Sequence, residues 1–271
     1  MEEDQEKVGP DAQVCVTASP AVGGGGVKGN VIIVGATAAI GKAVVREFAR
    51  QGYGVVCCGR DIEEVRKVAA DALLRYRVPV ASYPFDALRL EQHERLFRTL
   101  AREQRDVVGM LVVHGYLDDC DSVDMSLAGL RKTVDVNYTS VVTATMGFVR
   151  WFRSEGNFVA VVGSVAGERG KKRNMVYSSA KSAVSTYLDG LRLALPEITV
   201  VEVRPGFIDT PMTYGNLPRV AFFVGTRETV ARDVFSGILR KKKVVYTPFY
   251  WRYILFVLRN LPRVMYDRLV L

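Results

Sequence analysis

The sequence predicts an α/β fold in which helices cover both faces of a doubly wound parallel sheet. Short runs rich in Val and Ile alternate with longer segments of helical period, and continuous apolar strands indicate a sheet that is buried on both faces. Apolar residues make up 49% of the 271-residue chain, which is enough for one large core. No repeat or linker divides the chain, so we expect a single three-layer α/β/α domain.

The predicted elements follow one another in strict alternation. Strands are expected at 31–34, 55–58, 78–83, 107–113, 158–162 and 199–203. Helices are expected at 39–50, 62–75, 88–102, 127–152 and 174–195. Each strand is four to seven residues long and each helix longer than ten, which separates the two kinds of element.

The two ends of the chain differ from its middle. Residues 1–28 contain a run of four glycines and few apolar side chains, so we expect a disordered arm. The first residues are acidic and no apolar segment follows, so we expect no secretory signal. Four cysteines without paired spacing and two histidines indicate reduced thiols in a cytoplasmic protein, and no metal site.

The turn between the first strand and the first helix has the composition of a phosphate-binding turn. Gly35 ends the strand and Gly41 lies at the start of the helix. The first glycine permits a tight turn, and the second lets a pyrophosphate approach the helix N-terminus. The spacing is not G-x-G-x-x-G, so this segment alone is equally consistent with an ordinary strand-to-helix turn.

Three charged residues follow the second and third strands. Arg60 lies where an arginine can face the 2′-phosphate of NADPH, which favours NADPH over NADH, although a solvated surface arginine is the alternative. Asp61 is expected to be the N-cap of the next helix. Asp86 either contacts the adenine of the coenzyme or caps the third helix.

Tyr177 and Lys181 share one face of a predicted helix, where a cation can lower the pKa of a phenol and make it a usable acid or base. This spacing alone is common. Ser164 ends the fifth predicted strand, 13 residues before Tyr177, and Asn137 lies in mid-helix, where asparagine is unfavourable. A Pro205-Gly206 turn follows the sixth strand.

These motifs together resemble the classical short-chain dehydrogenase/reductase family over roughly residues 30–245. The resemblance implies a Rossmann-like domain at 29–247 that binds a nicotinamide coenzyme. It also implies that Ser164 holds the substrate oxygen, Tyr177 transfers its proton, Lys181 holds the nicotinamide ribose and lowers the tyrosine pKa, and Asn137 supports a water relay. The implied cofactor-binding residues are Gly35, Thr37, Ala38, Ile40, Gly41, Arg60, Asp86, His114, Gly115, Tyr177, Lys181, Pro205, Gly206, Ile208 and Thr210.

The sequence departs from the family pattern in two turns. Val34 and Ala39 replace a threonine and a glycine of the phosphate-binding turn, and the methyl group of Ala39 tightens the approach of a pyrophosphate. Val112-Val113-His114-Gly115 replaces the family's N-N-A-G. We interpret His114 as a turn residue beside the adenosine ribose and not as a catalytic base.

A narrower resemblance is to the decaprenylphosphoryl-2-keto-ribose reductases and their bacterial relatives, and it implies a polyprenyl-phosphate pentose as the substrate of a step in cell-wall biosynthesis. The segments that carry it are 166–174, 137–139 and 253–271. Between Ser164 and Tyr177 lie four cationic residues that are expected to receive a phosphate, or to form a solvated loop: Arg169, Lys171, Lys172 and Arg173.

The segment 248–271 predicts a basic, aromatic helical tail. Residues 240–271 carry eight basic residues and one acid. Thr247 and Pro248 are expected to begin the helix and Pro262 to end it. A helix of roughly 20 Å is too short to span a bilayer. It is expected to lie on an anionic membrane surface, with packing on the domain or on another subunit as the alternative.

The predicted function is the NAD(P)H-dependent reduction of a keto group by a homo-oligomeric enzyme. The substrate alternatives are the lipid-linked keto-pentose and another apolar ketone, such as a long-chain keto lipid or a steroid-like carbonyl. A dinucleotide-binding sensor without chemistry is the alternative of a different class. Nucleic-acid binding is not expected, because the aromatic residues of the tail form a continuous apolar run and not a solvated groove.

Overall fold

The computed structural model describes residues 27–118, 121–170, 172–213 and 224–270, with side chains described up to Tyr266. The expected arm at 1–28 lies outside the described residues except for its last two. A seven-stranded parallel sheet has the order β3-β2-β1-β4-β5-β6-β9. The predicted doubly wound parallel sheet is therefore confirmed.

The strands lie close to their predicted positions. The bounds are β1 Asn30–Val34, β2 Gly54–Gly59, β3 Val80–Pro84, β4 Val107–Val112, β5 Phe158–Val162, β6 Thr199–Pro205 and β9 Val244–Thr247. A separate two-stranded parallel pair joins β7 Phe207–Ile208 to β8 Val224–Gly225. The sequence pattern does not predict β9, because its four residues directly follow a run of basic residues and show no long apolar stretch.

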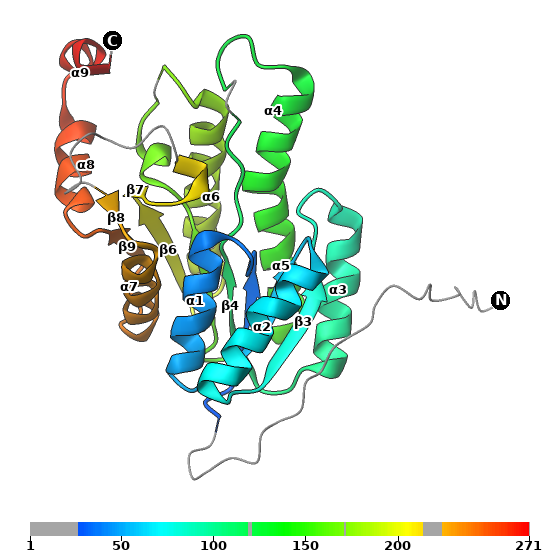
Figure 1. Ribbon diagram of the computed structural model, residues 1–271. Coiled ribbons are helices and arrows are strands. Elements are labelled where there is room, and N and C mark those ends of the chain that lie inside the picture. The colour runs from blue at the N-terminus through cyan, green and yellow to red at the C-terminus, as the bar shows by residue number, and fades with distance from the viewer. Residues whose placement is uncertain (1–26, 119–120, 171, 214–223, 271) are drawn as a thin grey trace.

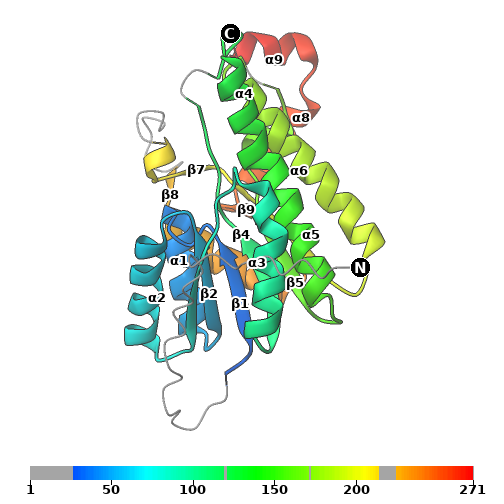
Figure 2. The ribbon, with the colours of Figure 1, turned by 90° about the vertical axis from the view of Figure 1, so that its right-hand side faces the viewer.

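Helices cover both faces of the sheet (Figures 1 and 2). On one face lie α1 Ala39–Arg50, α2 Ile62–Tyr76 and α7 Arg227–Leu239, and on the other lie α3 Leu90–Glu103, α4 Leu127–Val134, α5 Ser140–Phe152 and α6 Met175–Ala194. The side chains of β1 alternate between the two cores: Val31 and Ile33 face α1, and Ile32 and Val34 face the α5–α6 side. Both faces of the sheet are therefore buried, which explains why its strands are continuously apolar.

The long helix predicted at 127–152 contains one irregular turn. The turn is a π-helix at Asp135–Thr139, between α4 and α5. A π-turn inserts an extra residue into a helix and often occurs at functional sites. Asn137 lies at its centre, so the unfavourable asparagine noted in the sequence coincides with the irregularity.

The C-terminal tail forms two helices, α8 Trp251–Asn260 and α9 Arg263–Val270. The predicted N-cap role of Thr247 is wrong, because Thr247 is the last residue of β9 and Tyr250 is the N-cap of α8. One face of α8 packs on the domain, where Trp251 and Leu255 are buried beside Val165. The alternative of packing on the domain therefore holds for this face.

Cys57 and Cys58 are buried free thiols in β2, and burial raises the pKa of Cys57 to about 12. These two side chains are structural. In the described part of the chain, we find no helix with the length and apolar character needed to cross a bilayer.

Candidate active site

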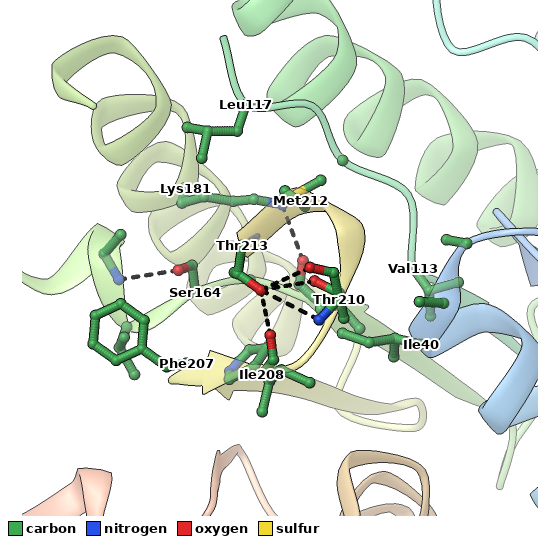
Figure 3. Close-up of a pocket in the computed structure, with 18 of the residues that line it drawn as sticks. Ile40, Val113, Leu117, Ser164, Lys181, Phe207, Ile208, Thr210, Met212 and Thr213 are labelled. Carbon is green, nitrogen blue, oxygen red and sulfur yellow. Dashed lines mark hydrogen bonds between the residues drawn. The ribbon is translucent and has the colours of Figure 1, made fainter. Parts of the chain in front are cut away.

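A cavity of about 490 Å³ lies at the carboxyl ends of the central strands. In a parallel α/β sheet this is where ligands bind, beside the point at which the strand order reverses. Figure 3 shows Ser164 and Lys181 around the same cavity as Leu117, Phe207 and Met212. The predicted site residues that line it are Thr37, Ala38, Ile40, His114, Gly115, Ser164, Tyr177, Lys181, Pro205, Gly206, Ile208 and Thr210.

The turn after β1 is packed too closely for a side chain at either of its two glycines. Gly35 has a φ of +90°, and a Cβ atom there would lie 2.7 Å from the backbone nitrogen of His114. A Cβ atom on Gly41 would lie 2.1 Å from the carbonyl oxygen of Gly35. Ala38 precedes α1 without a side-chain cap, and the first turn of α1 carries no acid. The uncapped N–H groups at the start of α1 therefore suit the pyrophosphate of a dinucleotide.

Ser164, Tyr177 and Lys181 come together from two elements at one end of the cavity. Ser164 follows β5, and its hydroxyl accepts a hydrogen bond from the backbone N–H of Ala166 at 3.1 Å. Tyr177 and Lys181 lie one turn apart on α6, with the lysine Nζ 5.7 Å from the centroid of the tyrosine ring. The Lys181 ammonium donates to the carbonyl oxygen of Val162 at 3.1 Å.

Burial dominates the protonation of this group of residues. It raises the pKa of Tyr177, and the hydrogen bond with Ser164 opposes the rise. Burial lowers the pKa of Lys181 to about 8, and the negative charge of Glu202 opposes that fall. The expectation of a lowered tyrosine pKa is therefore wrong for this arrangement. A protonated phenol at neutral pH is the form that donates a proton to a carbonyl.

Residues 29–219 match the family model described as short chain dehydrogenase. The chain belongs to the short-chain dehydrogenase family. It is thus an oxidoreductase of this type, as the combination of Asn137, Ser164, Tyr177 and Lys181 predicts. The narrower resemblance to decaprenylphosphoryl-2-keto-ribose reductases is not shown by these comparisons.

Several named proteins are similar to this short-chain dehydrogenase. An uncharacterized oxidoreductase of Mycobacterium tuberculosis is 29% identical over 242 residues, which cover 88% of this chain and 96% of the relative. An uncharacterized oxidoreductase of Streptomyces coelicolor is 28% identical, with 89% and 96% covered. The 11-beta-hydroxysteroid dehydrogenase A of Sesamum indicum is 23% identical, with 82% and 69% covered.

Solved structures have the same fold. A short-chain dehydrogenase from Burkholderia cenocepacia in complex with NADP has a TM-score of 0.75 at 20% identity, with 90% of this chain and 98% of the other covered. One from Sphingobium yanoikuyae in complex with NADPH has a TM-score of 0.73 at 22% identity, with 87% and 97% covered. At these identities the likeness establishes the fold alone.

Asn137 connects the π-turn of this dehydrogenase to the loop after β4. Its side chain is 0% exposed. Its Nδ2 donates to the carbonyl oxygens of Tyr116 at 2.6 Å and Thr133 at 2.9 Å, and its Oδ1 accepts from the N–H of Tyr116 at 3.1 Å. A Cβ atom on Gly115 would lie 3.2 Å from this Oδ1 and 3.7 Å from the Nζ of Lys181. Through its bonds to Tyr116, Asn137 therefore fixes the loop that places Gly115 beside Lys181.

Asp121 is a residue that the sequence did not single out, and it caps the helix that carries Tyr177 and Lys181. Its carboxylate accepts hydrogen bonds from the N–H groups of Val176 at 3.0 Å and Tyr177 at 2.8 Å. Its carbonyl oxygen accepts from the N–H of Asn174 at 3.0 Å. Asp121 is 4% exposed and caps α6 from a distant loop. A capping residue next to the helix in sequence would have been visible, but one more than fifty residues earlier leaves no local signal.

The predicted adenosine-side residues lie at the ends of their strands. Arg60 is exposed after β2, and the carboxylate of Asp61 caps α2 as predicted. The Oδ1 of Asp86 accepts from the N–H of Leu88 at 3.0 Å, so it serves the turn before α3. The ring Nε2 of His114 lies 2.6 Å from Ser140 Oγ, and burial lowers the pKa of His114 to about 3. An imidazole with so low a pKa binds a proton too weakly to act as a general base near neutral pH, in agreement with the interpretation as a turn residue.

The apolar wall of the cavity includes a residue of the C-terminal tail, which sequence reasoning also missed. Trp251 of α8 lines the cavity, and its ring packs edge-on against Phe207 at 5.6 Å between centroids. A Cβ atom on Gly206 would lie 1.8 Å from the indole nitrogen of Trp251. The glycine of the P-G turn is therefore needed for the close approach of α8, in addition to any contact with a coenzyme.

The basic loop before α6 divides into two parts. Arg169 was expected to receive a substrate phosphate, but its guanidinium donates to the carbonyl oxygens of Leu258 and Leu261 and stacks on the ring of Tyr266 at 3.8 Å. This corrects the expectation for Arg169, because its donors cap the end of α8. Lys172 and Arg173 are exposed, and Lys171 lies outside the described residues. Among the residues with described placement, no cluster of three His, Cys, Asp or Glu side chains suits a metal ion.

Proposed function

We propose that this protein is an NADPH-dependent reductase of a keto group. When bound, the nicotinamide coenzyme supplies the hydride. Tyr177 donates the proton of its phenol to the carbonyl oxygen, and the hydroxyl of Ser164 donates a hydrogen bond to the same oxygen. Lys181, buried beside the tyrosine, stabilises the phenolate that remains after transfer. The observation that carries this proposal is the convergence of these three side chains in one cavity.

The substitution Tyr177→Phe tests the catalytic proposal. The variant keeps the ring but loses the proton, so we expect turnover of a reducible ketone to fall by about 10²- to 10⁴-fold or more. Binding of NADPH, followed by the change in its fluorescence, should remain within a few-fold of the wild type. Near-wild-type turnover by a folded variant would falsify the assignment. Coenzyme binding by a wild type that reduces no ketone would favour the sensor alternative.

The preference for NADPH over NADH is part of the proposal and is supported by Arg60. Its exposed guanidinium follows β2, where the adenosine ribose of a dinucleotide lies in this fold. The Burkholderia and Sphingobium structures contain NADP and NADPH, respectively. The value of kcat/KM should be higher with NADPH than with NADH. The variant Arg60→Ala should reduce that ratio, and equal values for the wild type would contradict the proposal.

For the substrate, we propose a ketone with a large apolar part, and specifically the 2-keto group of a polyprenyl-phosphate-linked pentose in cell-wall biosynthesis. Support comes from the apolar wall formed by Leu117, Phe207 and Trp251. The exposed cations Lys172 and Arg173, directly before α6, suit a phosphate. The steroid dehydrogenase of sesame among the similar proteins favours the alternative of another apolar ketone.

An assay that compares substrates decides between these alternatives. Oxidation of NADPH would be followed with a polyprenyl-phosphate 2-keto-pentose, a long-chain keto lipid, a steroid ketone and small soluble ketones. The proposal expects the highest kcat/KM with the lipid-linked sugar. A higher value with the steroid or keto lipid would replace it with the alternative. A preference for small soluble ketones would contradict both.

For the cellular location, we propose a cytoplasmic protein that docks peripherally on an anionic membrane surface, because a lipid-linked substrate is reached there. Support comes from the outer side of α8, where Tyr253 and Phe256 are exposed next to Arg252. We also propose a homo-oligomer, supported by the exposed apolar side chains Leu127, Met146 and Leu193 on α4, α5 and α6. Sedimentation velocity would measure the oligomeric state, and a monomer at micromolar concentration would contradict it.

A further inference from the structure

A fully buried carboxylate lies behind the cavity, on the strand next to Ser164. Glu202 of β6 is 0% exposed. The transfer of a carboxylate from water into a protein costs several kcal/mol unless partners compensate it. A buried ion pair is often no more stabilising than apolar side chains of the same volume. Stability alone therefore does not account for a buried glutamate at this position, and its contacts must supply the reason.

Glu202 lies between the helix that carries Lys181 and the strand end that carries Ser164. Its Oε1 accepts a hydrogen bond from the hydroxyl of Ser185 at 2.6 Å. Ser185 lies one turn after Lys181 on α6, and its hydroxyl also lies 3.2 Å from the carbonyl oxygen of Lys181. On the other side, a Cβ atom on Gly163 would lie 2.9 Å from the same Oε1. The carboxylate thus spans the gap between α6 and the end of β5.

The second oxygen of Glu202 begins a chain of charges that reaches the C-terminal tail. Oε2 accepts from the guanidinium of Arg204 at 2.7 Å. Arg204 also donates to Glu168, whose carboxylate accepts from the phenol of Tyr246 at 2.7 Å and pairs with Arg259 of α8 at 3.2 Å. The charges of Glu202 and Glu168 are therefore balanced by those of Arg204 and Arg259. If Glu202 is neutralised, Arg204 still has Glu168 as a partner.

The groups that face Lys181 differ in charge. Tyr177 of α6 and His114 after β4 are both neutral at pH 7, because burial raises the pKa of the first and lowers the pKa of the second. Val162 of β5 contributes a carbonyl oxygen. From β6, Glu202 contributes a negative charge that favours the protonated lysine. Arg204 is on the far side of this carboxylate and is paired with it.

We propose that Glu202 is a positioning residue of the active site. Its carboxylate ties the Lys181 turn of α6 to β6 through Ser185, and its negative charge keeps the buried lysine protonated. Its kinetic consequences rest on the proposed reductase function, while its effect on the charge of Lys181 does not.

The variant Glu202→Gln tests whether the carboxylate keeps Lys181 protonated, and this test requires no enzyme assay. Competitive acylation with acetic anhydride, read by mass spectrometry, gives the pKa of the Lys181 amine, since Lys181 lines the cavity and is within reach of a small reagent. Loss of a nearby negative charge makes deprotonation easier, so the pKa should fall by roughly one unit. Glu155→Gln is the matched control, because Glu155 is exposed and its loss changes the net charge equally. An unchanged pKa in folded Glu202→Gln overturns the proposal.

The effect of Glu202 on catalysis is measured as the pH dependence of kcat/KM. Removal of a negative charge lowers the pKa of both the lysine ammonium and the tyrosine phenol, so the alkaline limb of kcat/KM should move to lower pH in Glu202→Gln. A merely structural role would reduce the rate without moving the limb. If Glu202→Gln does not fold, Ser185→Ala decides: kcat should fall by roughly tenfold with unchanged KM for NADPH, and a wild-type kcat overturns the proposal. Failure of Tyr177→Phe to lose turnover would remove the reductase function but leave the acylation result interpretable.

Discussion

At the scale of one residue, the buried ammonium of Lys181 lowers the free energy of unfolding of the protein. Its side chain is 3% exposed, and burial lowers its pKa to about 8 from 10.5. The folded protein therefore binds this proton less tightly than the unfolded chain. The resulting penalty is present in full below pH 8 and disappears as the pH rises through 10.5, where the unfolded chain also loses the proton. At roughly 1.4 kcal/mol per unit, the penalty is about 3 kcal/mol.

The first prediction at this scale is that Lys181→Met stabilises the protein while it abolishes turnover. Methionine keeps the unbranched chain but removes the buried charge and the bond to the Val162 carbonyl. We expect the free energy of unfolding to rise by about 2 kcal/mol at pH 7 and the gain to vanish near pH 10.5. Urea denaturation at both pH values measures it. Lys242→Met, at an exposed lysine, is the control and should change neither value. If Lys181→Met is less stable than the wild type at pH 7, the hydrogen bond to the Val162 carbonyl contributes more to stability than burial of the ammonium costs.

At the scale of secondary structure, the position of Tyr177 depends on how α6 begins. Asn174, which precedes the helix, has a φ of +60° and provides no side-chain cap. The carboxylate of Asp121 takes over this role and accepts from two N–H groups, one of them the amide of Tyr177 itself. The negative charge also suits the helix N-terminus. The loop after β4 therefore fixes the start of α6, the helix that carries Tyr177 and Lys181.

We predict that Asp121→Ala reduces both stability and turnover. Loss of the cap leaves two partly buried N–H groups without this acceptor, so the free energy of unfolding should fall by about 1–2 kcal/mol and kcat by roughly tenfold or more. Asp61→Ala is a matched control, because Asp61 also caps its helix through two N–H groups. It should lose similar stability but keep kcat at saturating NADPH. Equal loss of kcat in both variants would mean that the effect is one of general stability.

The sequence predicted the elements of this fold better than the contacts between them. The helix at 39–50 has the predicted bounds, because an amphipathic period and apolar flanking strands are local signals. Ser164, Tyr177 and Lys181 were found through their spacing and order. Asp121, Trp251 and Glu202 were missed, because each acts on a residue distant in sequence and none stands in a recognisable motif. Arg169 was misassigned, since its charge is visible in the sequence but its partners on α8 are not.

At the scale of the whole molecule, the C-terminal helices have two different faces. The inner face of α8 packs on the domain and contributes Trp251 to the cavity. The outer face exposes Tyr253 by 64% and Phe256 by 70%, and Val264 and Met265 of α9 are exposed as well. Figure 1 shows α8 and α9 at one edge of the molecule. At the start of α8, Trp251 packs against Phe207 of β7, and both side chains line the cavity. Because Trp251 lines the cavity, a surface that binds α8 would lie close to that cavity.

The last prediction is that this outer face binds anionic membranes. Between residues 248 and 266 the chain has no acid, and Arg252 is exposed beside the aromatic side chains of this face, so an anionic surface complements its charge while the aromatic side chains enter the interface. We expect the wild type to float with phosphatidylcholine vesicles that contain roughly one third phosphatidylserine, and to dissociate from them at high salt, where charges are screened. The double variant Tyr253→Glu and Phe256→Glu should stay with the soluble fraction.

The control for this prediction is Leu74→Glu, since Leu74 is an even more exposed apolar side chain on α2, far from the tail in sequence and on another helix. It should float like the wild type. Flotation on neutral vesicles alone would show that apolar contact suffices and that the basic residues have another role. A wild type that remains soluble at low salt with anionic vesicles would contradict membrane docking. Concentration-dependent self-association that the double variant abolishes would then assign the same face to a second copy of the chain.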